Sequence, residues 1–303
     1  TSRKISGSPI TYGLSIAVFC TSWTFYGSVG KAASSGMLYS TVYIGPTITF
    51  ILLWQIMRRM IRIKQRYRIT SIADFISARY DRSTSLAALA SCAALAGATP
   101  YIALQVKSLS ATFSIIANAP SSSASWNSNE IDLVAVLFMI IFTIAFGARH
   151  IDSTERHQGM ITVVAVQAVV KLSAFLACGI FITYFVNNGI GDVFRSLDIH
   201  GLDIASFLTL AGPTETSHST WAIYLLLSMS AIMFLPHQFH VAVVENSDEK
   251  HLTTAMWLFP LYAILISLFV IPIALTGIRI GARMGAADTY VLELPLLFQE
   301  PWL

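Results

Sequence analysis

Hydroxyls, a glycine and large aromatic rings follow one another inside an otherwise apolar stretch, in the run Cys20-Thr21-Ser22-Trp23-Thr24-Phe25-Tyr26-Gly27. Such a run can unwind, so that backbone carbonyls and helix ends face an ion or a solute. It can also remain helical, with its small residues at a tight packing face between helices. The spacing alone favours neither interpretation.

Lys171 is a cation near the middle of an apolar segment that begins at Met160. A charge at that depth is costly in a membrane and usually faces a cavity or a partner. No Asp or Glu lies deep in any apolar segment, so we expect the partner to be a carbonyl cluster, a solute carboxylate or an acid outside this chain. A role in function and a buried structural contact remain equal alternatives.

Proline-containing stretches carry the remaining polar candidates. Tyr101 and Gln105 share a helix face after Pro100, and Gln105 is deep enough to need a partner in the bundle or to bind a solute. Lys107 lies nearer the end of the same segment, where its long side chain can reach the membrane surface. In the run Leu235-Pro236-His237-Gln238-Phe239-His240, the proline should break the helix and free carbonyls.

Several kinds of chemistry are not indicated. His237 and His240 share a helix face, but no third ligand is placed for a metal, so a polar pathway lining or an interfacial cluster is the better interpretation. The glycine motifs of phosphate-binding, dinucleotide-binding and hydrolytic enzymes do not occur. The three cysteines have no C-x-x-C spacing and are expected to be small buried hydrophobes: Cys20, Cys92 and Cys178. We therefore predict no catalytic centre and no bound metal.

Membrane helices must position these residues. Of 303 residues, 55% are hydrophobic and only 12% charged, about half the charged fraction of a soluble domain. A helix needs ~20 apolar residues to cross the hydrocarbon core. Seven segments reach that length, so we predict an all-α, multi-span bundle: 10–30, 37–57, 84–116, 131–148, 160–186, 221–240 and 255–281.

The positive charges alternate between successive loops. Thirteen Lys and Arg residues fall in one set of loops and four in the other. Lys and Arg accumulate on the cytoplasmic side, so we expect a multi-pass protein of the cell (inner) membrane with Thr1 inside and Leu303 outside. The basic residues of 58–68 should set this topology and meet anionic lipid heads, which argues against a nucleic-acid partner. Ser71 and Asp74 predict a capped amphipathic helix on the cytoplasmic surface.

Several short motifs occur in a fixed order along nearly the whole chain: Ser22-Trp23 with Gly27, Thr70-Ser71-Ile72-Ala73-Asp74-Phe75 with Arg79-Tyr80, Gly147 with 153–158, and Pro236-His237. In this order they resemble the sodium:solute symporter family. The runs 142–151 and 155–159, Lys171-Leu172, and 235–240 followed by Glu245-Asn246 look more like one branch, the sensor histidine kinases with a symporter-like membrane domain. We expect both chain ends to continue in a longer protein.

The resemblance implies a fold of two inverted five-helix repeats, of which the first five segments form one and the last two open the other. It implies a small organic solute, such as an amino acid or carboxylate, and sodium as a coupling ion. Only half of a sodium site falls in this chain, at the backbone of Ala17 and Cys20. In the kinase branch, ATP and a response regulator would bind a cytoplasmic kinase core outside this chain.

Two departures from proline-permease-like members bear on the ion. Phe19-Cys20 stands where those members have an aspartate, and Val241 stands where they have an arginine. Both departures favour a sensor or an altered coupling ion.

The resulting hypothesis is the solute-binding or transport membrane domain of a symporter-like sensor histidine kinase, which would work by alternating access around two broken helices. It assigns the solute site to Ser22, Trp23, Tyr26 and Gly27, to Gln105, and to Pro236, His237 and Gln238, with Lys171 neutralising a carboxylate or holding the bundle. The alternatives are a stand-alone cation:amino-acid or carboxylate symporter and a seven-span receptor of rhodopsin type, which the expected inside N-terminus opposes.

Overall fold

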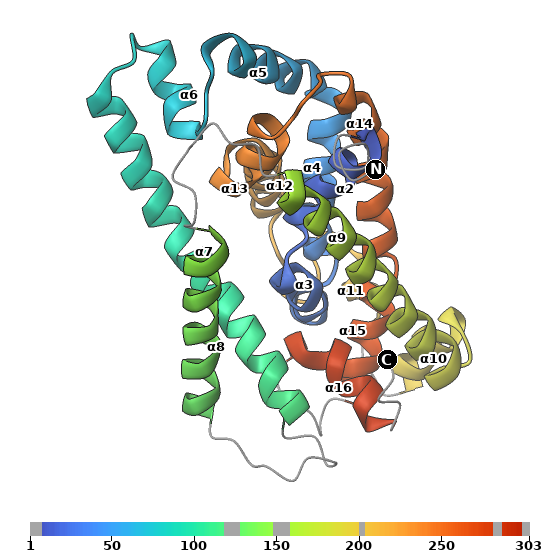
Figure 1. Cartoon of the computed structure of the whole chain (residues 1–303). Helices are drawn as coiled ribbons and strands as arrows, with labels where there is room; N and C mark the ends of the chain where they lie inside the picture. The colour runs from blue at the N-terminus through green and yellow to red at the C-terminus, as the bar shows by residue number, and fades with distance from the viewer. Residues whose placement is uncertain (1–7, 118–127, 148–157, 200–203, 281–286, 299–303) are drawn as a thin grey trace.

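The computed structural model is a bundle of helices (Figure 1) and describes residues 8–117, 128–147, 158–199, 204–280 and 287–298. These residues contain helices, turns and bends but no strand. The prediction of an all-α membrane bundle is therefore confirmed.

The first expected span is two helical pieces separated by extended backbone. Helix α2 (Pro9–Ser15) is capped by Ser8, whose Oγ accepts a hydrogen bond from Thr11 N at 3.1 Å, and it continues into the 3-10 turn η1 (Ile16–Phe19). Cys20 and Thr21 then leave the helical region, with ψ angles of 83° and −178°, before α3 (Ser22–Ser35) begins. Of the run Cys20–Gly27, only Cys20 and Thr21 leave the helical conformation, and Ser22–Gly27 belong to α3.

The next span ends earlier than expected. Gly36 turns the chain with a φ of 58° and opens η2 (Gly36–Ser40), which leads into α4 (Thr41–Leu52). The chain then bends by 71° into α5 (Trp54–Tyr67). Residues 54–57, predicted to complete the span 37–57, belong instead to α5, because this basic amphipathic helix turns away from the axis of α4.

The predicted cap at Ser71 is confirmed in helix α6 (Ile72–Arg79). Ser71 Oγ accepts a hydrogen bond from Asp74 N at 3.1 Å, and Asp74 Oδ2 accepts one from Thr70 N at 3.1 Å. Two side chains thus satisfy exposed N–H groups at the start of the helix, which is why a short helix forms here.

The remaining helices follow in order: α7 (Thr84–Ala117), α8 (Ser128–Phe142), the π-helix η3 (Thr143–Gly147), α9 (Gln158–Ile180), the π-helix η4 (Phe181–Val186), α10 (Ile190–Ile199), α11 (Ile204–Leu208), α12 (His218–Phe234), α13 (Pro236–Phe239), the π-helix η5 (His240–Val244), α14 (His251–Ser267), α15 (Val270–Ile280), η7 (Ala287–Thr289) and α16 (Tyr290–Leu297). In Figure 1, α5 and α6 lie at one end of the bundle, and α16 and the end of α7 lie at the other.

Within the described residues, three helices are long and apolar enough to cross a membrane, and five spans result if each bent pair counts as one. The three are Thr84–Ile116, Gly159–Val186 and His251–Ile280. Large apolar side chains such as Leu89 and Leu95 are about two-thirds exposed on α7. In a membrane these surfaces face lipid, where exposure of Leu has no hydrophobic cost.

Two buried apolar clusters lie on either side of the break in the first span. One packs α3, α9 and α15 around residues such as Phe175, and the other packs α2, α12 and α14 around residues such as Phe259. Phe19, the last residue before the break, contacts both clusters. The break is thus held between two packed halves of the bundle.

Helices α4 and α12 pack closely at Gly45. A Cβ at this position would lie 2.6 Å from Ser228 Cβ and 2.9 Å from Leu225 O and Met229 N, and backbone atoms cannot move aside. We predict that Gly45→Ala lowers the unfolding free energy by ~1–3 kcal/mol, the usual cost of overpacking. Thermal unfolding in nanodiscs measures this. Gly97→Ala is the control, since nothing lies within 4 Å of its Cβ, and equal effects of both changes would contradict the close packing.

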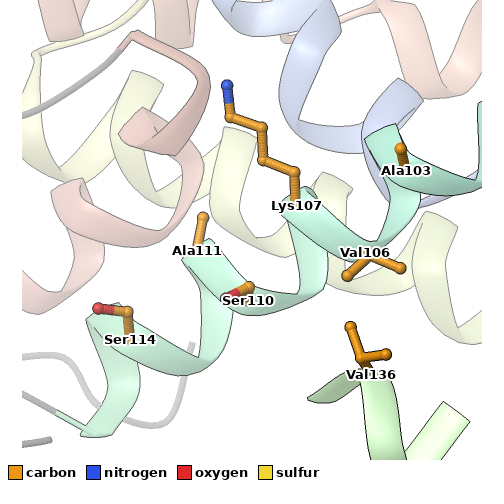
Figure 2. Close-up of a pocket in the computed structure, with 7 residues that line it drawn as sticks. All are labelled: Ala103, Val106, Lys107, Ser110, Ala111, Ser114 and Val136. Atoms are coloured by element: carbon orange, nitrogen blue, oxygen red, sulfur yellow. The ribbon is translucent and has the colours of Figure 1, made fainter. Parts of the chain in front are cut away.

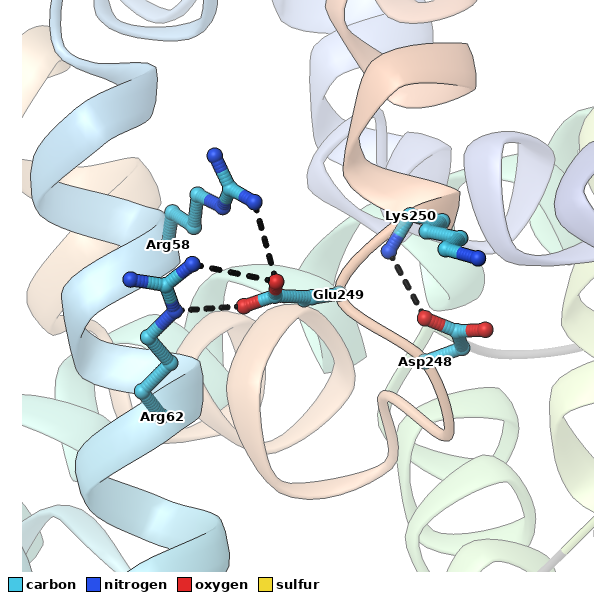
Figure 3. Close-up of polar contacts among 5 residues, drawn as sticks. All are labelled: Arg58, Arg62, Asp248, Glu249 and Lys250. Atoms are coloured by element: carbon cyan, nitrogen blue, oxygen red, sulfur yellow. Dashed lines mark hydrogen bonds and ion pairs between the residues drawn. The ribbon is translucent and has the colours of Figure 1, made fainter.

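Helix α5 is clamped to the start of α14 by Glu249, as Figure 3 shows. Arg58 Nη2 donates to Glu249 Oε1 at 2.9 Å, and Arg62 Nε donates to Glu249 Oε2 at 2.6 Å. The hydrogen bonds from Arg62 and Arg58 lower the pKa of the Glu249 carboxyl to about 2. Because the folded pKa lies below the usual value of ~4.3, the clamp stabilises fully above that value and is lost as the pH falls toward 2.

Glu249→Gln should therefore remove part of the acid sensitivity of folding between pH 5 and pH 2. We expect the variant to have a lower melting temperature than the parent at pH 7, and the difference to shrink on acidification or at high salt. Melting curves across that pH range provide the measurement. Asp248→Asn is the control, because within the described residues Asp248 Oδ1 accepts a hydrogen bond only from the nearby Lys250 N, at 2.9 Å (Figure 3). Identical pH profiles for the parent and Glu249→Gln would contradict the clamp.

Candidate functional site

A second break in the bundle lies beside the first. Leu235 is extended (φ −63°, ψ 131°), as expected for a residue before proline, and the chain bends by 50° between α12 and α13. Helix α13 contacts η1, the last turn before the Cys20–Thr21 break. Two segments 215 residues apart, Cys20 and Leu235, therefore bring their interrupted backbones into one region.

Lys171 reaches the first break from α9. Its Nζ donates a hydrogen bond to the carbonyl oxygen of Cys20 at 2.5 Å. That oxygen lies at the end of η1, where helix carbonyls have lost their regular partners. Of the three partners expected for this lysine, the structure provides the carbonyl. Lys171 thus brings a positive charge to the break.

Helix α7 links the two breaks through Tyr101. The Tyr101 and His237 rings are stacked, with centroids 5.0 Å apart and planes 18° apart. The Tyr101 phenol also interacts with the Thr21 hydroxyl. One aromatic side chain therefore contacts a residue at each break, and all of these residues are only partly buried.

Gln238 is a fully buried side chain on α13, with 0% exposure. Neither its amide nitrogen nor its amide oxygen has a hydrogen-bond partner among the described residues. A primary amide offers two donors and an acceptor, and leaving such a group buried without partners costs ~1–3 kcal/mol. A polar group of this kind next to two interrupted helices is suited to bind a polar ligand.

The other residues predicted for the solute site divide between two places. Ser22 and Trp23 form the first turn of α3, and their side chains lie outside the described part of the structure. Tyr26 and Gly27 line a cavity of about 130 Å³ further along α3. Gln105 lies one helical turn beyond Tyr101 on α7 and is half-buried. Sequence reasoning grouped all of these around one solute; the structure places Tyr26 and Gly27 at this cavity, between one and two turns of α3 beyond the Cys20–Thr21 break.

The backbone carbonyls of Ala17 and Cys20, expected to form half of a sodium site, both already accept hydrogen bonds. The Ala17 carbonyl accepts a hydrogen bond from Cys20 N at 2.9 Å, and the Cys20 carbonyl accepts the one from Lys171. A sodium ion at Cys20 would have to stand beside an ammonium group, and like charges at this distance repel strongly in a medium of low dielectric constant.

The two histidines near the second break have different partners. His237 stacks on Tyr101, whereas His240 Nε2 lies 3.3 Å from Glu245 Oε1. No group of three or more His, Cys, Asp or Glu residues that could hold a metal ion occurs within the described ranges. The motif positions 148–157 lie outside the described residues.

Sequence reasoning missed the contacts between Thr21, Tyr101 and His237. Tyr101 was noted only as a neighbour of Gln105 on one helix face. The available signal was an aromatic residue directly after Pro100 within a helix of small residues, since such a helix allows a neighbour to approach closely.

Comparison with known proteins gives one informative similarity. No protein-family model and no solved structure matches the chain. Over 301 residues the chain is 22% identical to a protein named "Uncharacterized symporter YhjB" from Bacillus subtilis (strain 168). The similarity covers 98% of this chain but 57% of that protein, so the chain spans less than two thirds of its relative. Together with the apolar helices, this similarity indicates a transporter-like membrane protein.

Proposed function

We propose that this chain binds a small organic solute between the two helix breaks and belongs to the translocating part of a symporter-like transporter. The observation that carries the proposal is the meeting of the two interrupted helices beside Gln238, a buried amide without a described partner. Broken helices at mid-depth occur where backbone polar groups line a cavity or a substrate path.

Charge at the site favours a solute with a carboxylate. Lys171 supplies a cation at the Cys20 carbonyl, and a carboxylate is a stronger partner for an ammonium group than a peptide carbonyl is. Gln238 and the rings of Tyr101 and His237 would contact the rest of the molecule. An amino acid or a short carboxylic acid satisfies this arrangement.

Alternating access would follow from movement of the half-helices around the site. The α12–α13 hinge at Leu235 and the backbone at Cys20–Thr21 are two non-helical points about which such a movement would occur. The Tyr101–His237 stack would then couple the two hinges, because α7 touches both.

We further propose that the Lys171 ammonium takes the place of sodium at the first break. The departures at Phe19-Cys20 and Val241 agree with an altered coupling ion. Solute binding should then be equally strong in sodium and in potassium buffers.

A thermal-shift screen of the protein in lipid nanodiscs tests the proposal. The panel contains the twenty common amino acids and carboxylic acids of two to four carbons, each in sodium and in potassium buffer. Solutes that raise the melting temperature are then followed by uptake into proteoliposomes. At least one solute should bind and be taken up; no stabilisation and no uptake by any member would contradict the proposal.

A second candidate is the sensory input domain of a histidine kinase, with a response regulator as the eventual partner. The run 235–240 followed by Glu245-Asn246 favours it, because movement of α13 would be transmitted directly to this segment. Asn246 O accepts a hydrogen bond from Lys64 Nζ at 3.0 Å, and Glu249 binds α5, at the end of the bundle expected to be cytoplasmic. The coding sequence after Leu303 separates the candidates: a kinase core supports the sensor, and further spans followed by a stop codon support a plain transporter.

A further inference from the structure

A small cavity lies between α3, α7 and the η7–α16 segment, further along α3 than the Cys20–Thr21 break. It has a volume of about 130 Å³, and its lining includes Tyr26, Thr112, Lys107 and Asp288. Helix α16, which contributes Leu292 to the lining, lies at the end of the bundle opposite α5 and α6 (Figure 1). A water molecule takes ~30 Å³ in the liquid, so the space suits a ligand of a few non-hydrogen atoms.

Two opposite charges stand at this cavity on different elements. Lys107 comes from α7 and Asp288 from η7, and both side chains are exposed, so a solute can reach them. Figure 2 shows Lys107 extending from α7 away from Val136 of α8, while Val106 points toward Val136. The groove between α7 and α8 is thus apolar where the two valines meet, and the lysine is directed toward the bundle.

The Asp288 carboxylate packs against a glycine of α3. It lies directly against Gly30 on α3, so close that a Cβ at position 30 would overlap the carboxylate oxygen Oδ1. Glycine is the residue that leaves this space open, one turn of α3 beyond Tyr26 and Gly27. The fold therefore holds an anion beside the cavity at a position that a larger residue would close.

The uncharged polar side chains that line the cavity carry hydroxyls, and the rest of the uncharged lining is glycine and apolar residues. The Tyr26 phenol interacts with the Thr112 hydroxyl across the α3–α7 contact, and Ser108 lies on the same lining. A cation from α7, an anion from η7 and hydroxyls on the same lining match a molecule that carries both charges. A dicarboxylate would meet Asp288 with like charge, and an amine without a carboxylate would meet Lys107 in the same way.

We propose that this cavity is a second binding site, selective for small zwitterionic amino acids, with Lys107 binding the carboxylate and Asp288 binding the ammonium group. This inference rests on the proposed function, because the cavity would receive the solute before the solute reaches the helix breaks. Tyr26 lies five residues beyond Thr21 on α3, a rise of ~7.5 Å, so the cavity and the break are neighbours along one helix.

The test measures dissociation constants of glycine, alanine, serine and proline, and of the N-acetyl and amide forms of each, by calorimetry in nanodiscs. The parent should bind at least one zwitterion at least tenfold more tightly than its two blocked forms. Asp288→Asn and Lys107→Gln should each raise the dissociation constant of that zwitterion at least tenfold. The Asp288→Asn variant should also lose the parent's preference for the zwitterion over its N-acetyl form.

Gly30→Ala tests the position of the Asp288 carboxylate without changing any charge. This variant should weaken binding of the zwitterion as Asp288→Asn does. Gly191→Ala is the control, since nothing lies within 4 Å of its Cβ. Asp288→Asn keeps the test valid if Gly30→Ala fails to fold, because the two side chains have the same shape.

Equal binding of the zwitterion by the parent, Asp288→Asn and Lys107→Gln would overturn the inference, and so would the absence of zwitterion binding by the parent. If a simple carboxylate is nevertheless taken up, the proposed function stands and only this second site falls. If zwitterions bind as expected but no solute is taken up, the second site stands and the transport proposal falls.

Discussion

Lys171→Met is expected to weaken solute binding at least tenfold and to lower the unfolding free energy by ~1–3 kcal/mol. Among the described residues, Lys171 is the only side-chain donor to the Cys20 carbonyl, so the change leaves the carbonyl of a buried residue in a broken helix without this partner. It also removes the cation that would bind a solute carboxylate. Calorimetric titration with the solute found in the thermal-shift screen, together with melting curves, measures both effects.

Two matched variants separate the roles of this lysine. Lys171→Arg keeps the charge and should retain part of the binding, whereas Lys250→Met removes a cation from a loop and should change neither quantity. A Lys171→Met protein that is less stable but binds a carboxylate solute with unchanged affinity would assign Lys171 to holding the bundle. Tighter solute binding in sodium than in potassium by the parent protein would contradict the proposal that this ammonium replaces sodium.

Gln238→Leu is expected to stabilise the empty protein and to abolish high-affinity binding. The amide is fully buried and has no described partner, so replacing it with an apolar side chain of similar size removes an unfavourable burial of ~1 kcal/mol or more. If the amide binds the solute, the same change should weaken binding at least tenfold. Melting temperature without solute and the dissociation constant with solute are the two measurements.

Asn187→Leu is the matched control, because Asn187 is another buried amide but has partners. Its Nδ2 donates to Ile182 O at 2.7 Å and to Thr276 Oγ1 at 3.0 Å. This variant should lose stability and keep its affinity for solute, the opposite of Gln238→Leu. Unchanged affinity in Gln238→Leu would remove this residue from the proposed site.

Much of the fold follows from the sequence because long apolar segments must be helical in a membrane. The Ser71–Asp74 cap was also predictable, since both partners lie within four residues of each other. The bend after Leu52 was not, because the apolar pattern continues to Met57 and only the packing of α5 shows where α4 ends.

The candidate site was predictable in kind but not in arrangement. Composition indicated that the Cys20–Gly27 run could unwind and that Lys171 needed a partner, without joining the two. Tyr101 and His237 are 136 residues apart, and nothing local to either position predicts that their rings stack. The closeness of Asp288 to Gly30 likewise depends on how η7 returns to α3, which only tertiary structure determines.

A cryo-electron microscopy map of the protein in nanodiscs, saturated with the solute that gives the largest thermal shift, tests the central claim most directly. The account predicts solute density between the Cys20–Thr21 break and α13, within hydrogen-bonding distance of Gln238. Density for the solute only on an outer surface, or a continuous helix through Cys20 and Thr21, would contradict it.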